Sequence, residues 1–341
     1  MNFGGKHGLF YMKGDNRMRI GIDLGGTKIA AGLVDENRNV IASVQEATDL
    51  PKPAEEIVLA VYNLVHRLLK EEGFTFEQVE SIGIGIPGTV NKETDVVEYA
   101  NNFGFEHVPF VKMLKEKFPC PLYAENDANA AAWGEYLAGG GRGSRSMVAV
   151  TLGTGVGGGI ILNGRIWGGE NGAGGELGHI VIEKGGRPCT CGRKGCLEAY
   201  ASATALVSQT QEAMENMPAS LLWTLCGGEL ENVNGRMVFE AVAKKDETAV
   251  AIRDNFIDYL AEGVASIINT LQPEVLCIGG GLSGAGAALL EPLQMKTAPL
   301  VYSRSSKKNT RLVLAELGND AGIIGAACLD EQCADNMCKC E

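Results

Sequence analysis

The chain has 341 residues, of which 45% are hydrophobic and 21% charged, and its formal net charge at pH 7 is −12. This length indicates two domains with adequate cores, and the acidic balance disfavours general binding to nucleic acids or anionic membranes. No apolar run approaches the roughly 20 residues that span a membrane, and residues 1–17 read as a leader without the apolar core of a signal peptide. We therefore expect a cytoplasmic protein whose ten cysteines bind metal or stay reduced.

The N-terminal part begins with strands around a pair of glycines. Arg19–Asp23 reads as a strand, Leu24–Lys28 as a turn that contains Gly25 and Gly26, and Ile29–Val34 as the next strand. A polar turn then leads to a third strand at 40–44.

A comparable unit returns roughly 130 residues later. Met147–Leu152 is predicted to be a strand, 153–159 a glycine turn, and Ile160–Leu162 the following strand. Asn163-Gly164 is a strong hairpin signal ahead of 165–167. The repeat suggests two related domains that face each other.

Other segments alternate between helical and extended patterns. Helices are predicted at 57–69, 203–214, 235–244 and 248–271, with a last helix from Asp320; strands are predicted at 81–86, 122–124, 275–278 and 311–314. This alternation indicates an α/β fold.

Three glycine loops are candidates for phosphate binding. In Asp23-Leu-Gly-Gly-Thr-Lys28, backbone amides beside the glycines can face phosphate oxygens, Thr27 can donate a hydroxyl, and Asp23 can hold Mg²⁺ through water. Alone, such a turn is more often a simple hairpin. The further loops at 153–159 and 279–281 favour a nucleotide cradle between two domains.

Asp127 is the acid best placed for chemistry. It lies at a predicted strand-to-helix junction, next to Asn126. The alternative is a helix N-cap, a position that aspartate favours. A cap would need neither Asn126 nor the carboxylates of Glu176 and Glu198, so we interpret Asp127 as a general base.

A cysteine and histidine cluster lies between these two carboxylates. Its members, His179, Cys189, Cys191 and Cys196, match the ligand set of a closed structural zinc site. Disulfides or free thiols are the alternative. A zinc clip would fix Glu176, His179 and Glu198 in one small volume. The C-terminal cysteines, Cys328, Cys333, Cys338 and Cys340, are interpreted instead as free thiols of a mobile tail.

The motifs together resemble those of the ROK sugar kinases, most closely the bacterial glucokinases of that family. The resemblance covers roughly residues 18–330 and is carried by 23–28, Ile-Pro-Gly at 86–88, Glu-Asn-Asp-Ala-Asn-Ala-Ala at 125–131, and the runs 152–159, 171–179 and 189–198.

The resemblance implies the actin-like ATPase fold, two ribonuclease-H-like domains with a cleft between them. The expected parts are a leader (1–17), an N-terminal domain (18–135), a C-terminal domain with the zinc clip (136–317), a helix at about 318–332 that returns to the N-terminal domain, and a Cys-rich tail (333–341). A homodimer or a dimer of dimers is expected.

Residue roles follow from the same resemblance. Asp127 becomes the catalytic base. The ATP phosphate sites are Asp23, Gly25, Gly26, Thr27, Lys28, Thr154 and Gly155, with Gly280 and Gly281 at the adenosine part. The sugar contacts are Gly88, Asn102, Asn126, Asp127, Glu176, His179 and Glu198. One ring nitrogen of His179 would bind zinc and the other the sugar. The family shows Asn-x-Gly-Trp where this chain has Asn102-Phe-Gly-Phe105, so Asn101 is the alternative if the register shifts.

The expected activity is transfer of a phosphoryl group from ATP, with Mg²⁺, to the 6-hydroxyl of glucose. Two alternatives keep the same phosphoryl-transfer chemistry. The acceptor could be N-acetylmannosamine, N-acetylglucosamine or fructose, or the donor could be polyphosphate. The non-enzyme alternative is a sugar-responsive repressor of the same family. It would need a DNA-binding domain, and only about 17 residues precede the first predicted strand.

Overall fold

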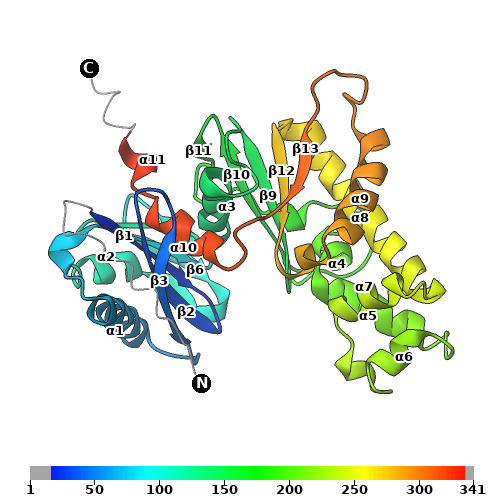
Figure 1. Ribbon diagram of the computed structural model, residues 1–341, viewed down its shortest axis with the longest axis horizontal. Coiled ribbons are helices and arrows are strands. Elements are labelled where there is room, and N and C mark those ends of the chain that lie inside the picture. Colours follow the sequence, from blue (N-terminus) through cyan, green and yellow to red (C-terminus); the bar gives the residue numbers. More distant parts are fainter. Residues whose placement is uncertain (1–16, 335–341) are drawn as a thin grey trace, which may run out of the picture.

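Residues 17–334 are described by the computed structural model, which contains two five-stranded sheets joined by central helices (Figure 1). In the first sheet the strand order is β3-β2-β1-β4-β8. Strand β2 pairs antiparallel with both β1 and β3, whereas β4 and β8 continue the sheet parallel to β1. The bounds are Met18–Leu24 (β1), Lys28–Val34 (β2), Val40–Ala47 (β3), Val79–Ile86 (β4) and Leu122–Asn126 (β8).

The second sheet repeats this arrangement in the order β11-β10-β9-β12-β13. Here β9, β10 and β11 are antiparallel neighbours, and β12 and β13 run parallel to β9. The bounds are Met147–Leu152 (β9), Val156–Leu162 (β10), Arg165–Ile166 (β11), Val275–Gly279 (β12) and Arg311–Leu314 (β13). The predicted α/β class and the predicted internal repeat are both confirmed.

Each sheet has its own helical cover. Helices α1 (Ala54–Glu72) and α2 (Phe110–Lys115) share a core with the first sheet, and α1 ends at Gly73 in the left-handed conformation, with φ of 72°. The second sheet shares its larger core with helices on the right of the view in Figure 1. These are α4 (Glu198–Ala201), α5 (Ala203–Met214), α6 (Leu221–Leu225), α7 (Gly235–Ala243), α8 (Glu247–Leu271) and α9 (Ala287–Thr297).

Two helices, α3 (Asp127–Ala138) and α10 (Asp320–Ala327), lie between the sheets (Figure 1). Along β1, Ile20 and Ile22 face the core shared with α1, so the alternating Gly21 faces α10 on the other side. A Cβ on Gly21 would lie 1.8 Å from the carbonyl oxygen of Ile323, and one on Gly83 1.7 Å from that of Ala326. Glycines therefore allow α10 to rest directly on the backbone of β1 and β4.

Glycines also allow the two central helices to pack closely against each other. A Cβ on Gly134 of α3 would lie 2.2 Å from the carbonyl oxygen of Ala321, and one on Gly325 of α10 would lie 1.7 Å from that of Ala130. Both are sub-van der Waals distances, so α3 and α10 cross with their backbones in contact.

Three expectations from the sequence need correction. The glycine turn predicted at 153–159 ends at Gly155, because Val156 begins β10. Gly157 and Gly159 instead leave room for α3, where Ala128 and Ala132 pack against the strand. The predicted C-terminal helix is interrupted after Ala327 and resumes as α11 (Glu331–Ala334).

The third correction concerns Cys328, which had been grouped with the tail. Its side chain is fully buried, and its carbonyl accepts a 3.0 Å hydrogen bond from Trp133 Nε1. The predictions for the leader and for Cys338 and Cys340 fall almost entirely outside the described residues.

A small three-stranded sheet was not predicted. It comprises β5 (Thr89–Asn91), β6 (Val96–Ala100) and β7 (Phe105–Val108), and it follows β4 directly. Among the helices in the described part of the chain, none combines the length and the apolar character needed to cross a membrane.

Candidate active site

The first glycine turn is fixed by its own backbone and by a neighbouring threonine. Gly25 N donates to Lys28 O at 2.9 Å, which closes the turn between β1 and β2. Thr48 then donates from its hydroxyl to Gly25 O at 2.7 Å and from its amide to Thr27 O at 3.0 Å. These bonds hold the carbonyl groups of the turn in place. Thr48 had no signal in the sequence, because it lies 20 residues away from the loop it holds.

Asp127 begins helix α3 but does not cap it. The N-cap is Asn126, whose Oδ1 accepts from Asn129 N at 3.1 Å, while its Nδ2 donates to Gly88 O at 3.0 Å. The Asp127 carboxylate accepts a single 2.9 Å bond from Ala128 N. The alternative that Asp127 is the helix cap is therefore wrong, and its other carboxylate oxygen is available for a ligand.

The carboxylates of Asp23, Asp127 and Glu176 come from separate elements and lie close enough to interact near the start of α3. Because β1, β4 and β8 are parallel, their carboxyl ends place Asp23, Gly88 and Asp127 along one edge of the sheet. Burial is the largest cause of a raised pKa at Asp127, and the negative charges of Asp23 and Glu176 raise that pKa further. Burial likewise raises the pKa of Asp23, while Lys28 opposes that shift.

The second and third glycine loops meet at the carboxyl ends of β9 and β12. Gly153 N donates to Gly155 O at 3.0 Å, which makes a tight turn, and Thr204 Oγ1 donates to Thr154 O at 2.8 Å. Gly280 has φ of 80°, and a Cβ there would lie 2.5 Å from Leu152 O, so the two loops touch.

A cavity of about 300 Å³ opens beside these two loops. It extends from α3 across β9 to the segment that leads into α10. Its lining includes Gly279, Gly280, Gly281, Ser283 and Asn319. The predicted adenosine-site glycines thus border a cavity, next to the loop that contains Thr154 and Gly155.

Asn102 lies between β6 and β7 of the small sheet, next to the first glycine turn. An ideal Cβ on Gly26 would be 3.6 Å from the Asn102 side chain, whereas Asn101 accepts a 3.2 Å bond from the exposed Tyr99 hydroxyl. This geometry favours Asn102 over Asn101 for a role in the site.

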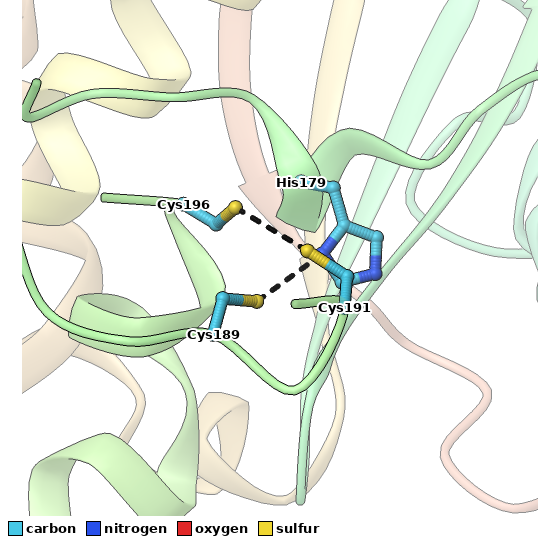
Figure 2. Close-up of side chains that lie close together, drawn as sticks. All are labelled: His179, Cys189, Cys191 and Cys196. Carbon is cyan, nitrogen blue, oxygen red and sulfur yellow. Dashed lines mark hydrogen bonds between the residues drawn. The ribbon is translucent and has the colours of Figure 1, made fainter. Parts of the chain in front are cut away.

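The predicted metal ligands form one cluster (Figure 2). Their ligand atoms, from His179, Cys189, Cys191 and Cys196, all lie within 4.8 Å of one another. Cys191 Sγ and Cys196 Sγ are 3.7 Å apart, and Cys189 Sγ is 3.6 Å from His179 Nδ1. Tetrahedral bonds of about 2.1–2.3 Å place ligand atoms roughly 3.6–3.8 Å apart, so both distances fit edges of a zinc tetrahedron.

The other nitrogen of His179 faces away from the cysteines. His179 Nε2 lies 3.9 Å from Glu176 Oε2, and the Glu176 side chain is exposed. A ring whose Nδ1 faces the cysteines can therefore present Nε2 to a ligand held by Glu176.

Glu198 connects the cysteine loop to the second glycine turn. Its Oε2 accepts from Val156 N at 3.0 Å, and its Oε1 accepts from Thr190 Oγ1 at 2.9 Å. A Cβ on Gly155 would lie only 2.4 Å from the same carboxylate. Glu198, a predicted sugar contact, therefore lies directly against Gly155, a predicted ATP contact.

Glu125 belongs to the site but was missed as an individual residue. Its side chain is 5% exposed, and Oε1 accepts from Asn126 N at 2.9 Å and from Asn129 Nδ2 at 3.1 Å. Lys92 pairs with its other oxygen. The buried Glu125 carboxylate holds the start of α3, whereas the Lys92 side chain is exposed. A sequence motif does not distinguish this role from direct contact with a ligand.

Two matching sheets whose glycine turns lie at strand ends, with an aspartate beside them, define a two-lobed α/β phosphotransferase. The ROK family model matches residues 19–332, and the chain belongs to this family.

Individual relatives agree with that membership. The chain is 38% identical over 309 residues to a glucokinase from Thermotoga maritima, covering 90% of this chain and 95% of that protein. It is 31% identical over 312 residues to an N-acetylmannosamine kinase from Citrobacter koseri, covering 91% and 97% of the two chains. The crystal structure of a ROK family glucokinase from Streptomyces griseus, in complex with glucose and AMPPNP, superposes with a TM-score of 0.78. It shares 35% identity, and the match covers 92% of this chain and 98% of that one.

Proposed function

We propose that the chain is an ATP-dependent glucokinase that phosphorylates the 6-hydroxyl of glucose. The observation that carries this proposal is the position of Asp127, which has an unoccupied carboxylate oxygen at the sheet edge shared with Asp23 and the first glycine turn. The glucokinases of Thermotoga maritima and Streptomyces griseus, at 38% and 35% identity, support glucose as the acceptor.

Asp127 acts as the general base in this proposal. A sugar hydroxyl is a poor nucleophile, and a carboxylate that accepts its proton as the P–O bond forms contributes typically 10²–10⁴-fold to the rate. Burial raises the pKa of Asp127, which makes its ionised carboxylate a stronger base. The amides of the glycine turns stabilise charge on the phosphates.

Asp23 and the neighbouring carboxylates suit a hard cation with oxygen ligands. Mg²⁺ bound with ATP would neutralise phosphate charge, and Asp23 would hold it through water. The residues 25–28, 154–155 and 280–281 are assigned to ATP, with Gly280 and Gly281 at the adenosine part.

Sugar recognition is assigned to side chains from both halves. Asn126 is oriented by Gly88 O, and Asn102 lies beside the phosphate turn. Glu176, His179 Nε2 and Glu198 approach from the second half. Glu198 Oε2 accepts one protein hydrogen bond, from Val156 N, and retains a lone pair for a hydroxyl, whereas Oε1 accepts from both Thr190 Oγ1 and Cys189 Sγ.

The cysteine cluster is proposed to bind one structural Zn²⁺. Two of the distances that join its members, 3.6 Å and 3.7 Å, fit the edges of a zinc tetrahedron, and three thiolates with one imidazole would complete a closed shell. The metal would rigidify the loop that presents His179 and Glu198.

The division into domains is proposed to follow the two sheets, at 18–135 with the C-terminal helix and at 136–317. Sugar contacts then come from both domains, and closure of one on the other would exclude water and limit ATP hydrolysis.

A coupled spectrophotometric assay tests the acceptor. kcat/KM is compared for glucose, mannose, fructose, N-acetylglucosamine and N-acetylmannosamine with saturating MgATP, and polyphosphate is then tried as the donor. Glucose is expected to lead, because a pocket that hydrogen-bonds the 2-hydroxyl can reject analogues without it by up to ~10⁴-fold. Asp127→Asn is the control that assigns the turnover to this site.

The second candidate is an N-acetylmannosamine kinase, which the Citrobacter koseri relative at 31% identity favours. If N-acetylmannosamine exceeds all the other sugars in kcat/KM, the glucokinase assignment is wrong and this candidate replaces it. No turnover with any of these sugars would refute both.

A further inference from the structure

The chain crosses between the two sheets twice. It leaves the first sheet through α3 and the segment 139–146, and it returns from β13 through 315–319 into α10. The relative placement of the sheets therefore depends on how these two crossing segments are held.

One buried carboxylate contacts both crossing segments. The side chain of Glu135, near the end of α3, is 4% exposed. Its Oε2 accepts from Gly140 N and from Glu316 N, both at 3.0 Å, and its Oε1 accepts from Leu317 N at 2.9 Å. One side chain thus joins the outgoing segment, the returning segment and the helix.

The outgoing segment lies so close to Glu135 that position 139 has no room for a side chain. A Cβ on Gly139 would lie 2.0 Å from Glu135 Oε2, so the outgoing segment passes directly over the carboxylate. Backbone amides are the groups that satisfy this charge, since none of the ion pairs in the described chain includes Glu135. A buried carboxylate bound by amides alone is sensitive to the loss of any of them.

Glu135 also connects two parts of the proposed active site. It lines the cavity next to Gly280 and Gly281. The same helix begins with Asp127, eight residues earlier, which is about 12 Å along a helix axis.

We propose that Glu135 is a positioning residue that clamps both crossing segments to helix α3, so that the nucleotide cavity and the catalytic aspartate are held in one geometry. This inference rests on the proposed kinase function. It assigns Glu135 no contact with substrate; its effect passes through the three amides.

The test compares Glu135→Gln with Glu316→Gln. The first keeps the shape of the side chain but removes its charge and places an amide donor against amide donors. The second makes the same charge change in the returning segment, at a side chain that is 57% exposed. Among the described residues, Arg142 at 3.4 Å is its one ion-pair partner. Glu316→Gln leaves the backbone bond from Glu316 N to Glu135 intact, so it is the matched control.

Two readouts are measured on each purified full-length variant. Hydrogen exchange of the amides of Gly140, Glu316 and Leu317 reports the clamp directly. Steady-state kinetics with MgATP and the preferred sugar report its effect on the reaction. For Glu135→Gln we expect faster exchange at these amides. We also expect a fall of roughly tenfold or more in kcat/KM for MgATP, seen in kcat as well as KM. Glu316→Gln should stay within about twofold of wild type.

Unchanged exchange in Glu135→Gln would overturn the clamp. Faster exchange with wild-type kinetics would show that the carboxylate has a structural role only, and would overturn its positioning role. If Glu135→Gln is insoluble, Glu135→Asp, which keeps the charge but is one methylene shorter, takes its place with the same outcomes. A wild-type protein that phosphorylates no sugar would refute the proposed function, while the exchange measurement would still decide on the clamp.

Discussion

Adding one methyl group at Gly83 should separate α10 from the first sheet. A Cβ there would lie 1.7 Å from the carbonyl oxygen of Ala326 and 2.5 Å from its carbonyl carbon. Restoring a 3.0 Å contact requires α10 to retreat by about 1.3 Å. The obstacle is backbone, so no side-chain rotation can relieve it. Overpacking of this kind costs typically 1–3 kcal/mol, and we expect Gly83→Ala to fall at the upper end, with a loss of about 3 kcal/mol.

Urea unfolding followed by fluorescence is a suitable assay. Trp133 is buried, and its Nε1 donates to Cys328 O just beyond α10, so its emission reports the docking of this helix. Gly284→Ala is the matched control, because a Cβ at that glycine meets nothing within 4 Å. It should change the free energy of unfolding by no more than about 0.5 kcal/mol. Equal stability of the two variants would refute the backbone-to-backbone packing of α10.

Three further outcomes follow from the site. Asp127→Asn should lower kcat by about 10²–10⁴-fold. Because burial raises the folded-state pKa of Asp127, the ionised group destabilises the fold once the pH exceeds that value. The neutral variant should therefore melt roughly 2 °C higher at pH 7. Glu176→Gln removes a negative charge that raises the Asp127 pKa, so the acid limb of the kcat profile should move to lower pH; a shift to higher pH would contradict this. Cys191→Ser should lose about one equivalent of zinc by elemental analysis and lose sugar affinity with it; full glucose affinity in the zinc-free variant would sever that link.

The strand pattern was readable from the sequence because its signals are local. Apolar runs bounded by glycine and by Asn163-Gly164 predicted the strands of both sheets to within a few residues, and the helix predicted at 57–69 lies within α1. The glycines at 157 and 159 misled the prediction for a physical reason. Glycine serves both turns and close packing, and only the position of α3 reveals that these two glycines accommodate a helix.

The sequence predicted the residues proposed to contact ligands, but it did not predict the residues that hold them in position. Asp127 and the His179 cluster have recognisable residue types at telling positions. Glu135 looks like any helix glutamate, since its amide partners lie more than 180 residues further along the chain, apart from Gly140. Asn126, not Asp127, caps α3, because its side chain reaches both Asn129 N and Gly88 O. Choosing between two adjacent polar residues required three-dimensional contacts.

The equal strand order of the two sheets makes α3 and α10 equivalent, since each follows the last strand of its own sheet. Yet α3 packs on β10 of the second sheet, and α10 packs on β1 and β4 of the first. Each half thus covers part of the other half's sheet with its final helix, while α3 also contacts β4 of its own sheet. An isolated first half would leave the glycine face of β1 and β4 uncovered, and an isolated second half would leave that of β10 bare. The two halves therefore depend on each other for their fold, because each supplies a helix that covers glycines of the other's sheet.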